Sequence, residues 1–143
     1  MIVADLMTRT VITVSPETPV LDARQEMLKQ KIRHLPVIAS GPELLGIVTD
    51  RDIRLSLPSQ ATSLSVWELN FLLTKLTVEK VMTRTVITVG PERPAPDAAR
   101  LMLDHKIGAL PVMDGGRLVG IVTETDMLRA FVHMATPELA RRT

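Results

Sequence analysis

The stretch Leu44–Asp52, LLGIVTDRD, decides the fold, because the chain repeats it at Leu118–Asp126 as LVGIVTETD. Each copy is a short apolar run followed by a threonine, two polar residues and an aspartate. An apolar run of this length that ends in Thr-x-x-Asp predicts a buried strand that turns directly into a helix. Because the first turn of a helix has backbone N–H groups without intrahelical partners, this junction is a candidate place for binding.

A longer internal duplication surrounds the two copies. The segment Met7–Val14 recurs without change as Met82–Val89, at an offset of 75 residues. From residue 7 to residue 38 the two copies agree at 20 of 32 positions. The offset falls to 74 at Gly46 and Gly120, because the second loop is one residue shorter. Two copies are too few for a solenoid, so they indicate two similar halves that complete each other.

Both copies predict the element order β-α-β-β-α, which makes a mixed α+β fold. In the first copy we expect a helical turn near residues 3–7, strands at 11–14, 35–38 and 44–48, a helix that starts at residue 19 and includes residue 28, and a helix at 49–57. In the second copy we expect strands at 86–89, 110–113 and 117–122, a hairpin turn at 114–116, and helices at 94–105 and 123–134. The first long helix has Thr18 as its expected N-cap and Pro19 at its first position.

The long helix of each copy has an apolar stripe that predicts its buried face. The stripes are Val20, Ala23, Met27 and Leu28 in the first copy and Ala95, Ala98, Met102 and Leu103 in the second. A half of about 55 residues buries only about 60% of the surface of its unfolded chain, so we expect the halves to share one core. The expected domains are a first repeat at 1–57, a connector at 58–77, a second repeat at 78–134 and a tail at 135–143 with almost no helix.

Composition narrows the class of protein. Of 143 residues, 45% are apolar and 23% are charged, which is typical of a globular protein. The absence of cysteine excludes a disulfide framework, a thiol nucleophile and thiolate metal sites. The net charge of +1 argues against nucleic-acid binding. No apolar stretch approaches the roughly 20 residues of a membrane helix, and no basic segment opens the chain, so we expect a cytoplasmic protein without a signal peptide.

The segment between the repeats predicts a loop and a helix. Residues 56–62 are polar and should form the loop. The capping-box pattern SVWE at Ser65–Glu68 should start a helix that runs to about Leu76. Trp67 and Phe71 lie four residues apart on it. Two interpretations stay open: the helix packs across the repeats as a connector, or its two aromatic side chains meet a second subunit, because exposed aromatic groups often mark an interface.

The tandem units resemble a pair of CBS domains, which are named after cystathionine β-synthase. The residues that carry the resemblance are the two Gly-Ile-Val-Thr-x-x-Asp junctions, the two Leu-Pro-Val segments at 35–37 and 110–112, and the two Val-Ile-Thr-Val segments. The similarity covers Val3 to about Phe131. Residues 1–3, 32–37, 67–76 and 125–132 resemble, more narrowly, the bacterial acetoin-utilisation-type CBS proteins.

The resemblance implies an assembly and a ligand. It implies a pseudo-two-fold axis between the repeats and a homodimer of two tandem pairs. Clefts between paired domains would bind an adenosine-containing molecule such as AMP, ADP, ATP or S-adenosylmethionine, with no required cofactor. Other members of the family have no known ligand and act as assembly modules. An effector protein that the sequence does not identify is a further expected partner.

The first candidate binding residues are the repeated pair Thr49 and Asp52, with Thr123 and Asp126. A carboxylate can accept two hydrogen bonds from a ribose diol, and a threonine hydroxyl can donate to a phosphate or ribose oxygen. The resemblance implies these contacts. The same pattern is also close to a capping box, in which the aspartate is stabilised by the helix dipole without any ligand. Both interpretations can hold.

The resemblance also implies contacts to adenine from the segments that open the first strands. These candidates are Thr10, Val11, Ile12, Thr85, Val86 and Ile87. For each of these residues, the alternative is that its side chain only packs in the hydrophobic core.

Basic residues distinguish the two copies. Arg33 and His34 precede the strand that begins with Leu35 and Pro36, where an arginine can bind a phosphate bidentately and a histidine responds near neutral pH. The alternative is an exposed arginine and a hydrogen-bonded surface histidine. The second copy has Gly108 and Ala109 at these positions, followed by Leu110 and Pro111, and it has Thr125 where the first has Arg51. The two sites should therefore differ, with more positive charge in the first repeat.

We expect no catalytic machinery. The three histidines, at positions 34, 105 and 133, lack the spacing of metal ligands, and no nucleophile triad, Walker loop or Gly-x-Gly-x-x-Gly motif is present. Two hypotheses follow. The chain is a regulatory module that binds an adenine nucleotide and signals through the geometry of a dimer, or it is a structural and dimerisation module without a small-molecule ligand.

Overall fold

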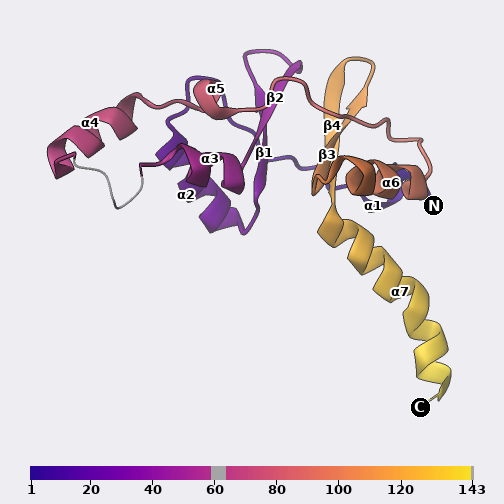
Figure 1. Ribbon diagram of the computed structural model, residues 1–143. Helices are drawn as coiled ribbons and strands as arrows, with labels where there is room; N and C mark the ends of the chain where they lie inside the picture. Colours follow the sequence, from indigo (N-terminus) through magenta and orange to yellow (C-terminus); the bar gives the residue numbers. More distant parts are fainter. Residues whose placement is uncertain (59–63, 143) are drawn as a thin grey trace. The chain divides into compact units, whose positions relative to one another are not determined.

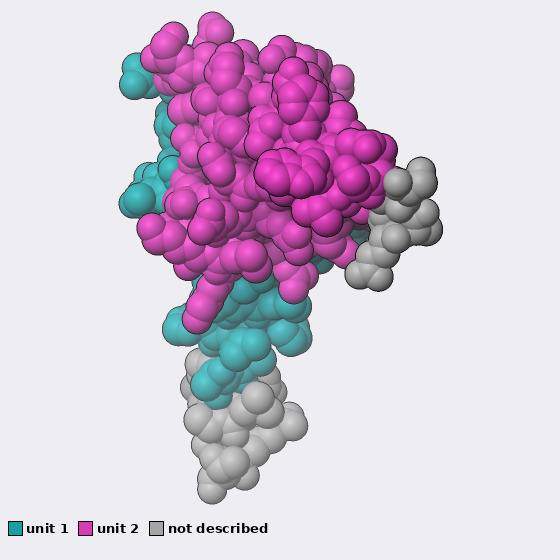
Figure 2. All heavy atoms as spheres, turned by 90° about the vertical axis from the view of Figure 1, so that its left-hand side faces the viewer, with its two compact units in different colours: residues 1–11, 87–143 teal, residues 12–86 magenta. Residues whose placement is uncertain are grey.

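The computed structural model describes residues 1–58 and 64–142, with residues 137–142 by backbone alone. The chain divides into two compact units (Figure 2). Unit 1 consists of Met1–Val11 and Ile87–Thr143, and unit 2 consists of Ile12–Val86. Each unit combines helices with a two-stranded antiparallel sheet, which confirms the predicted mixed fold. Part of the loop expected at 56–62 lies outside the described residues.

The elements follow the chain in the order that Figure 1 labels. Unit 2 contains α2 (Val20–Gln30), β1 (His34–Ile38), β2 (Leu44–Thr49), α3 (Asp50–Ser56), α4 (Val66–Lys75) and α5 (Val78–Val81). Unit 1 contains α1 (Val3–Leu6), α6 (Ala95–His105), β3 (Ala109–Asp114), β4 (Arg117–Thr123) and α7 (Glu124–Arg142). The strand-to-helix junctions predicted from the repeated stretch are therefore present in both units, as β2–α3 and β4–α7.

Tight pairing explains why the apolar runs form hairpins. In unit 2, Leu35 pairs with Val48 and Val37 with Gly46, so the strands bury their central residues against the helices. In unit 1 the hairpin turns at Gly115 and Gly116, whose φ angles of 58° and 79° lie in the left-handed region. Two consecutive positive φ angles match the twist of antiparallel strands, and glycine adopts them without strain.

The prediction of strands at residues 11–14 and 86–89 is wrong. Each is reduced to one parallel bridge, between Val14 and Val37 and between Val89 and Val112. The Val14 N–H donates to the Pro36 carbonyl at 3.1 Å, and the Val14 carbonyl accepts from Ile38 at 3.0 Å. The ladder does not continue because Pro16 and Pro91, two residues further on, have no N–H to donate.

Two helix ends also differ from expectation. Helix α2 begins at Val20 with Pro19 at the N-cap, and the Thr18 hydroxyl accepts from the Ser15 N–H at 3.1 Å instead of capping the helix. The tail that was expected to have almost no helix continues α7 as far as Arg142. Alanine, glutamate, leucine and arginine, which have high helix propensity, dominate this end of the chain.

Each unit contains most of one repeat and, in addition, the short first helix of the other repeat. Helix α5 opens the second repeat in the chain but belongs to unit 2, where Val78 is fully buried and its N–H donates to the Thr18 carbonyl at 2.8 Å. Helix α1 opens the first repeat but belongs to unit 1, where Val3 is fully buried and its N–H donates to the Arg93 carbonyl at 2.8 Å.

The residues after these short helices extend the sheets. Thr83 exchanges two backbone hydrogen bonds with Ile47 of β2, at 2.9 and 3.0 Å, and Thr8 exchanges two with Ile121 of β4. The approach is so close that a Cβ on Gly46 would lie 2.8 Å from the Thr83 carbonyl oxygen and 2.7 Å from the Met82 Sδ. Glycine in the repeated stretch is therefore required by this backbone contact.

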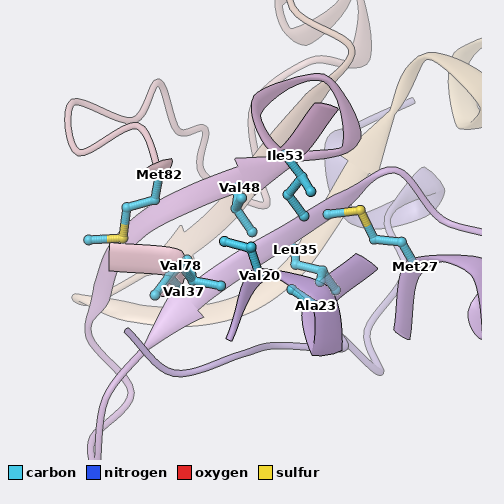
Figure 3. Close-up of a cluster of buried hydrophobic side chains, with 9 residues drawn as sticks. All are labelled: Val20, Ala23, Met27, Leu35, Val37, Val48, Ile53, Val78 and Met82. Carbon is cyan, nitrogen blue, oxygen red and sulfur yellow. The ribbon is translucent and has the colours of Figure 1, made fainter. Parts of the chain in front are cut away.

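The buried apolar residues of the described chain include one cluster in each unit. Figure 3 shows the cluster of unit 2, where side chains from α2, the two strands, α3 and α5 meet around Leu35 and Val48. Helices α1 and α5 complete these clusters, because they supply buried side chains that each half would otherwise lack.

One predicted position of each apolar stripe is wrong. The other stripe positions are buried as expected: Val20, Ala23 and Met27 in α2, and Ala95, Ala98 and Met102 in α6. Leu28 and Leu103 are instead 71% and 78% exposed. They follow the buried methionines directly, and one residue along a helix turns a side chain by about 100°, away from the sheet.

Candidate functional site

The end of the unit 2 sheet brings together five of the candidate residues. His34 pairs in register with Thr49, and the Asp50 N–H donates to the Arg33 carbonyl at 2.9 Å. Because Arg51 and Asp52 follow in the first turn of α3, the basic residues and the Thr-Asp pair share one end of the hairpin. We refer to this group, Arg33, His34, Thr49, Arg51 and Asp52, as the first junction.

The Thr-Asp pair of the first junction forms a complete capping box. The Asp52 N–H donates to the Thr49 Oγ1 at 3.0 Å, and the Thr49 N–H donates to the Asp52 Oδ2 at 3.0 Å. Both residues are half-buried. The capping interpretation is confirmed, and it leaves the Asp52 Oδ1 with no hydrogen-bond partner among the described residues.

The second junction consists of Gly108, Ala109, Thr123, Thr125 and Asp126 in unit 1. Its backbone matches the first junction: Ala109 pairs with Thr123, and the Glu124 N–H donates to the Gly108 carbonyl at 2.9 Å. Thr123 and Asp126 also exchange the two capping hydrogen bonds, at 2.9 and 3.3 Å.

The carboxylate of the second junction has further partners. The Thr123 hydroxyl donates to the Asp126 Oδ2 at 3.1 Å, and the Arg129 guanidinium lies 3.3 Å from the Asp126 Oδ1. Asp126 is 7% exposed, and it is the buried charged residue of the described chain. Arg129 was not among the residues predicted from the sequence. The signal that could have found it is its position three residues after Asp126, since side chains three apart are neighbours on a helix.

The two arginines of the first junction are solvent-exposed. Neither Arg33 nor Arg51 takes part in an ion pair within the part of the chain that the structure describes. The arginine one turn along α3, Arg54, is instead paired with Asp50 at 3.0 Å. The first junction therefore presents two guanidinium groups, whereas the second has none at the matching positions 108 and 125.

The remaining candidates occupy different environments. The strand residues are buried in the sheets of their own units: Leu35, Pro36, Ala109, Leu110 and Pro111. Thr10 and Thr85 are exposed, and Val11 and Val86 are half-buried. Ile12 and Ile87 pack against the core clusters of unit 2 and unit 1, so the core role that the sequence left open is observed for these two.

Helix α4 carries the aromatic residues predicted for a subunit interface. Its N-cap is Ser65, whose hydroxyl accepts from the Glu68 N–H at 3.2 Å, as the capping-box pattern predicts. Trp67 is 85% exposed and Phe71 is 59% exposed. The Lys75 Nζ lies 4.3 Å from the centre of the Phe71 ring, in reach of a cation–π interaction. None of the residues of α4 is buried in the single chain.

The described residues lack two kinds of feature. They contain no group of three or more histidine, aspartate or glutamate side chains placed to hold a metal ion. Nor is any of the helices in residues 1–58 and 64–142 long and apolar enough to cross a membrane.

Solved structures of similar proteins share the fold. A putative acetoin utilization protein from Vibrio cholerae is 31% identical, with a TM-score of 0.80 over 100% of this chain and 97% of that chain. The protein CBSX2 of Arabidopsis thaliana, solved in complex with AMP, is 36% identical, with a TM-score of 0.77 over 92% and 97% of the two chains. The CBS domain pair of protein MJ0100, solved with 5-methylthioadenosine and S-adenosyl-L-methionine, is 31% identical, with a TM-score of 0.76 over 92% and 99%.

Longer proteins contain a similar segment. The homoserine O-acetyltransferase of Methanococcoides burtonii is 38% identical over 128 residues, which are 89% of this chain. The chain spans 23% of the length of the first curated relatives that it matches. The model of the CBS domain matches residues 3–59 and 78–133, which together contain both strand-to-helix junctions. With two matched domains in tandem and the same fold in the solved relatives, this chain belongs to the CBS domain family.

Proposed function

We propose that this chain is a regulatory module that binds an adenine nucleotide or another adenosine derivative and signals through the geometry of a homodimer. The observation that carries the proposal is the first junction, at one end of a hairpin. It combines a threonine hydroxyl, two exposed arginines and a carboxylate oxygen that has no partner in residues 1–58 and 64–142. The ligands of two similar structures, AMP in one and S-adenosyl-L-methionine with 5-methylthioadenosine in the other, all contain adenosine.

The chemistry of the junction suits such a ligand. The Asp52 carboxylate can accept hydrogen bonds from a ribose diol while its other oxygen caps α3. A guanidinium group binds phosphate oxygens through two parallel hydrogen bonds, and the fork of Arg33 or Arg51 has no competing ion pair within the described chain. A ligand regulates through such a module only as far as it binds one arrangement more tightly than another.

Thermal unfolding with adenosine ligands tests the proposal. At millimolar AMP, ADP, ATP or S-adenosylmethionine, at least one ligand should raise the Tm, because a ligand at 100 times its Kd stabilises by about 2.7 kcal/mol. For a chain of this size that corresponds to roughly 5–10 °C. The shift should disappear in the Asp52→Ala, Asp126→Ala double variant, compared with that variant's own Tm without ligand.

The control for this series is guanosine monophosphate, which has the same ribose and phosphate but a different base. Equal shifts with AMP and guanosine monophosphate would contradict selection for adenine. If none of the four adenosine ligands shifts the Tm, the proposed function is wrong.

A second candidate function is a structural and dimerisation module without a small-molecule ligand. One observation favours it: both Thr-Asp pairs are satisfied as helix caps, and every buried side-chain nitrogen or oxygen of the described residues has a partner. The junctions are therefore stable without a ligand. Failure of the thermal-shift series would leave this function as the better one.

The homodimer is proposed to use the aromatic face of α4. Burying Trp67 and Phe71 against a second copy would remove large apolar surfaces from water, and interfaces are enriched in such side chains. Trp67→Ser with Phe71→Ser should shift the protein from dimer to monomer in analytical ultracentrifugation, with Kd raised by about tenfold or more. Leu103→Ser on α6, which alters a side chain of similar exposure, is the control. Dissociation by the control variant alone would place the contact on α6 instead.

A further inference from the structure

We propose that the two repeats are not equivalent binding places, and that Arg129 is the residue that closes the second. One adenosine phosphate would then bind per chain, at the first junction. This inference rests on the proposed function, and it is carried by the difference between the hydrogen bonds of the two repeated aspartates.

Both carboxylate oxygens of Asp126 have partners within unit 1. Its Oδ2 accepts from the Thr123 N–H at 2.9 Å and from the Thr123 hydroxyl at 3.1 Å. Its Oδ1 is paired with the Arg129 guanidinium at 3.3 Å. The Thr123 hydroxyl accepts from the Asp126 N–H at 3.3 Å, and its single hydrogen is used in the bond to the Asp126 Oδ2. A ribose at this place would have to displace contacts that the protein makes with itself.

The carboxylate of Asp52 has fewer partners. Among the described residues it accepts one hydrogen bond, from the Thr49 N–H at 3.0 Å. The Thr49 hydroxyl accepts from the Asp52 N–H but does not donate to the carboxylate, so its hydrogen is available to a ligand oxygen. The first junction therefore keeps both an acceptor and a donor for a ribose or phosphate group.

A single position in the duplication causes the difference. Three residues after the aspartate, the second repeat has Arg129 and the first has Leu55, which is 74% exposed and cannot pair with a carboxylate. Arg54, the residue before Leu55 in α3, is paired with Asp50 and not with Asp52. Changing one residue in each repeat should therefore exchange the behaviour of the two carboxylates.

The distribution of cations supports the same assignment. A nucleotide phosphate needs positive charge, which Arg33 and Arg51 supply at the first junction. The matching residues of the second junction, Gly108 and Thr125, carry none. Arg129 does not replace them, because the carboxylate of Asp126, 3.3 Å from its guanidinium, offsets its positive charge. The ligand class is thus a phosphate-bearing adenosine derivative, bound by unit 2.

Isothermal titration calorimetry of the full chain with AMP tests the assignment. The unmodified chain should bind one AMP. Asp52→Asn, which keeps a capping oxygen, should raise the Kd for AMP by tenfold or more. The matched change Asp126→Asn should leave the Kd within about twofold. Two AMP molecules per chain, or loss of binding in Asp126→Asn with Asp52→Asn unaffected, would overturn the assignment and leave the proposed function standing.

The reciprocal exchange tests the role of Arg129. Leu55→Arg should raise the Kd for AMP at the first junction by fivefold or more. Arg129→Leu should allow a second AMP molecule to bind per chain, with a higher Kd than the first. Far-UV circular dichroism of both variants verifies that they are folded. A single AMP in Arg129→Leu would show that Arg129 is not what closes the second repeat. If neither AMP nor any of the other three adenosine ligands binds any variant, the proposed function itself has failed.

Discussion

Removal of residues 1–9 is expected to unfold unit 1 and to leave unit 2 folded. These residues open the chain, yet their contacts belong to the second repeat. Val3 is fully buried, and Leu6 and Met7 pack against the same core cluster. The backbone of this segment also forms hydrogen bonds with Arg93, Pro91 and Ile121. Unit 2 makes up residues 12–86 and includes none of the deleted residues.

The expected loss is close to the whole stability of a small unit. Burying one large aliphatic side chain contributes about 1.5–3 kcal/mol, so three partly or fully buried ones contribute roughly 4–8 kcal/mol. Whole domains are stable by only about 5–15 kcal/mol. Hydrogen exchange measures the result directly: amides of β3 and β4 should lose protection, and amides of β1 and β2 should keep it.

Arg9→Ala is the control within the same segment, because Arg9 is exposed and should change the stability of unit 1 by less than about 0.5 kcal/mol. A synthetic peptide of residues 1–11, added to the shortened chain, should restore protection of β3 and β4. Full protection of these strands in the shortened chain, without the peptide, would contradict the exchange of short helices.

Leu35→Ala is expected to lower the free energy of unfolding of unit 2 by about 2–5 kcal/mol, the range for emptying a buried leucine site. Leu35 is fully buried at the centre of the cluster in Figure 3. The cost includes the cavity, because the cluster around this position has side chains from four other elements, which relax only in part.

Leu28→Ala is the matched control, with the same chemical change in the same unit. Leu28 is 71% exposed, so its truncation should cost less than about 0.5 kcal/mol. Urea denaturation followed by circular dichroism gives both values. Equal costs for the two variants would mean that Leu28 is buried in the protein in solution, contrary to the position of its side chain on α2.

Local chemistry made much of the candidate site predictable. The Thr-x-x-Asp spacing specifies which N–H meets which oxygen at a helix start, so both junctions and their capping bonds follow from the repeated stretch. The same spacing predicts the start of α4 at Ser65. The inequality of the junctions was also visible in Arg33 and Arg51 against Gly108 and Thr125. What the repeat pattern did not indicate was Arg129, because its role depends on a side-chain rotamer that spacing allows but does not require.

The sequence by itself determined the duplication, the hairpin of each repeat with the helices on either side of it, the family and the two strand-to-helix junctions. These properties depend on contacts between residues close along the chain, which periodicity and turn chemistry record. Only the tertiary structure decided which unit each short helix completes. The segments that follow the two helices, Met7–Val14 and Met82–Val89, are identical, so these segments do not predict which unit each helix joins. The contacts of the folded chain distinguish them: Val3 donates to the Arg93 carbonyl and Val78 donates to the Thr18 carbonyl, so the first helix of this protein belongs with its second repeat.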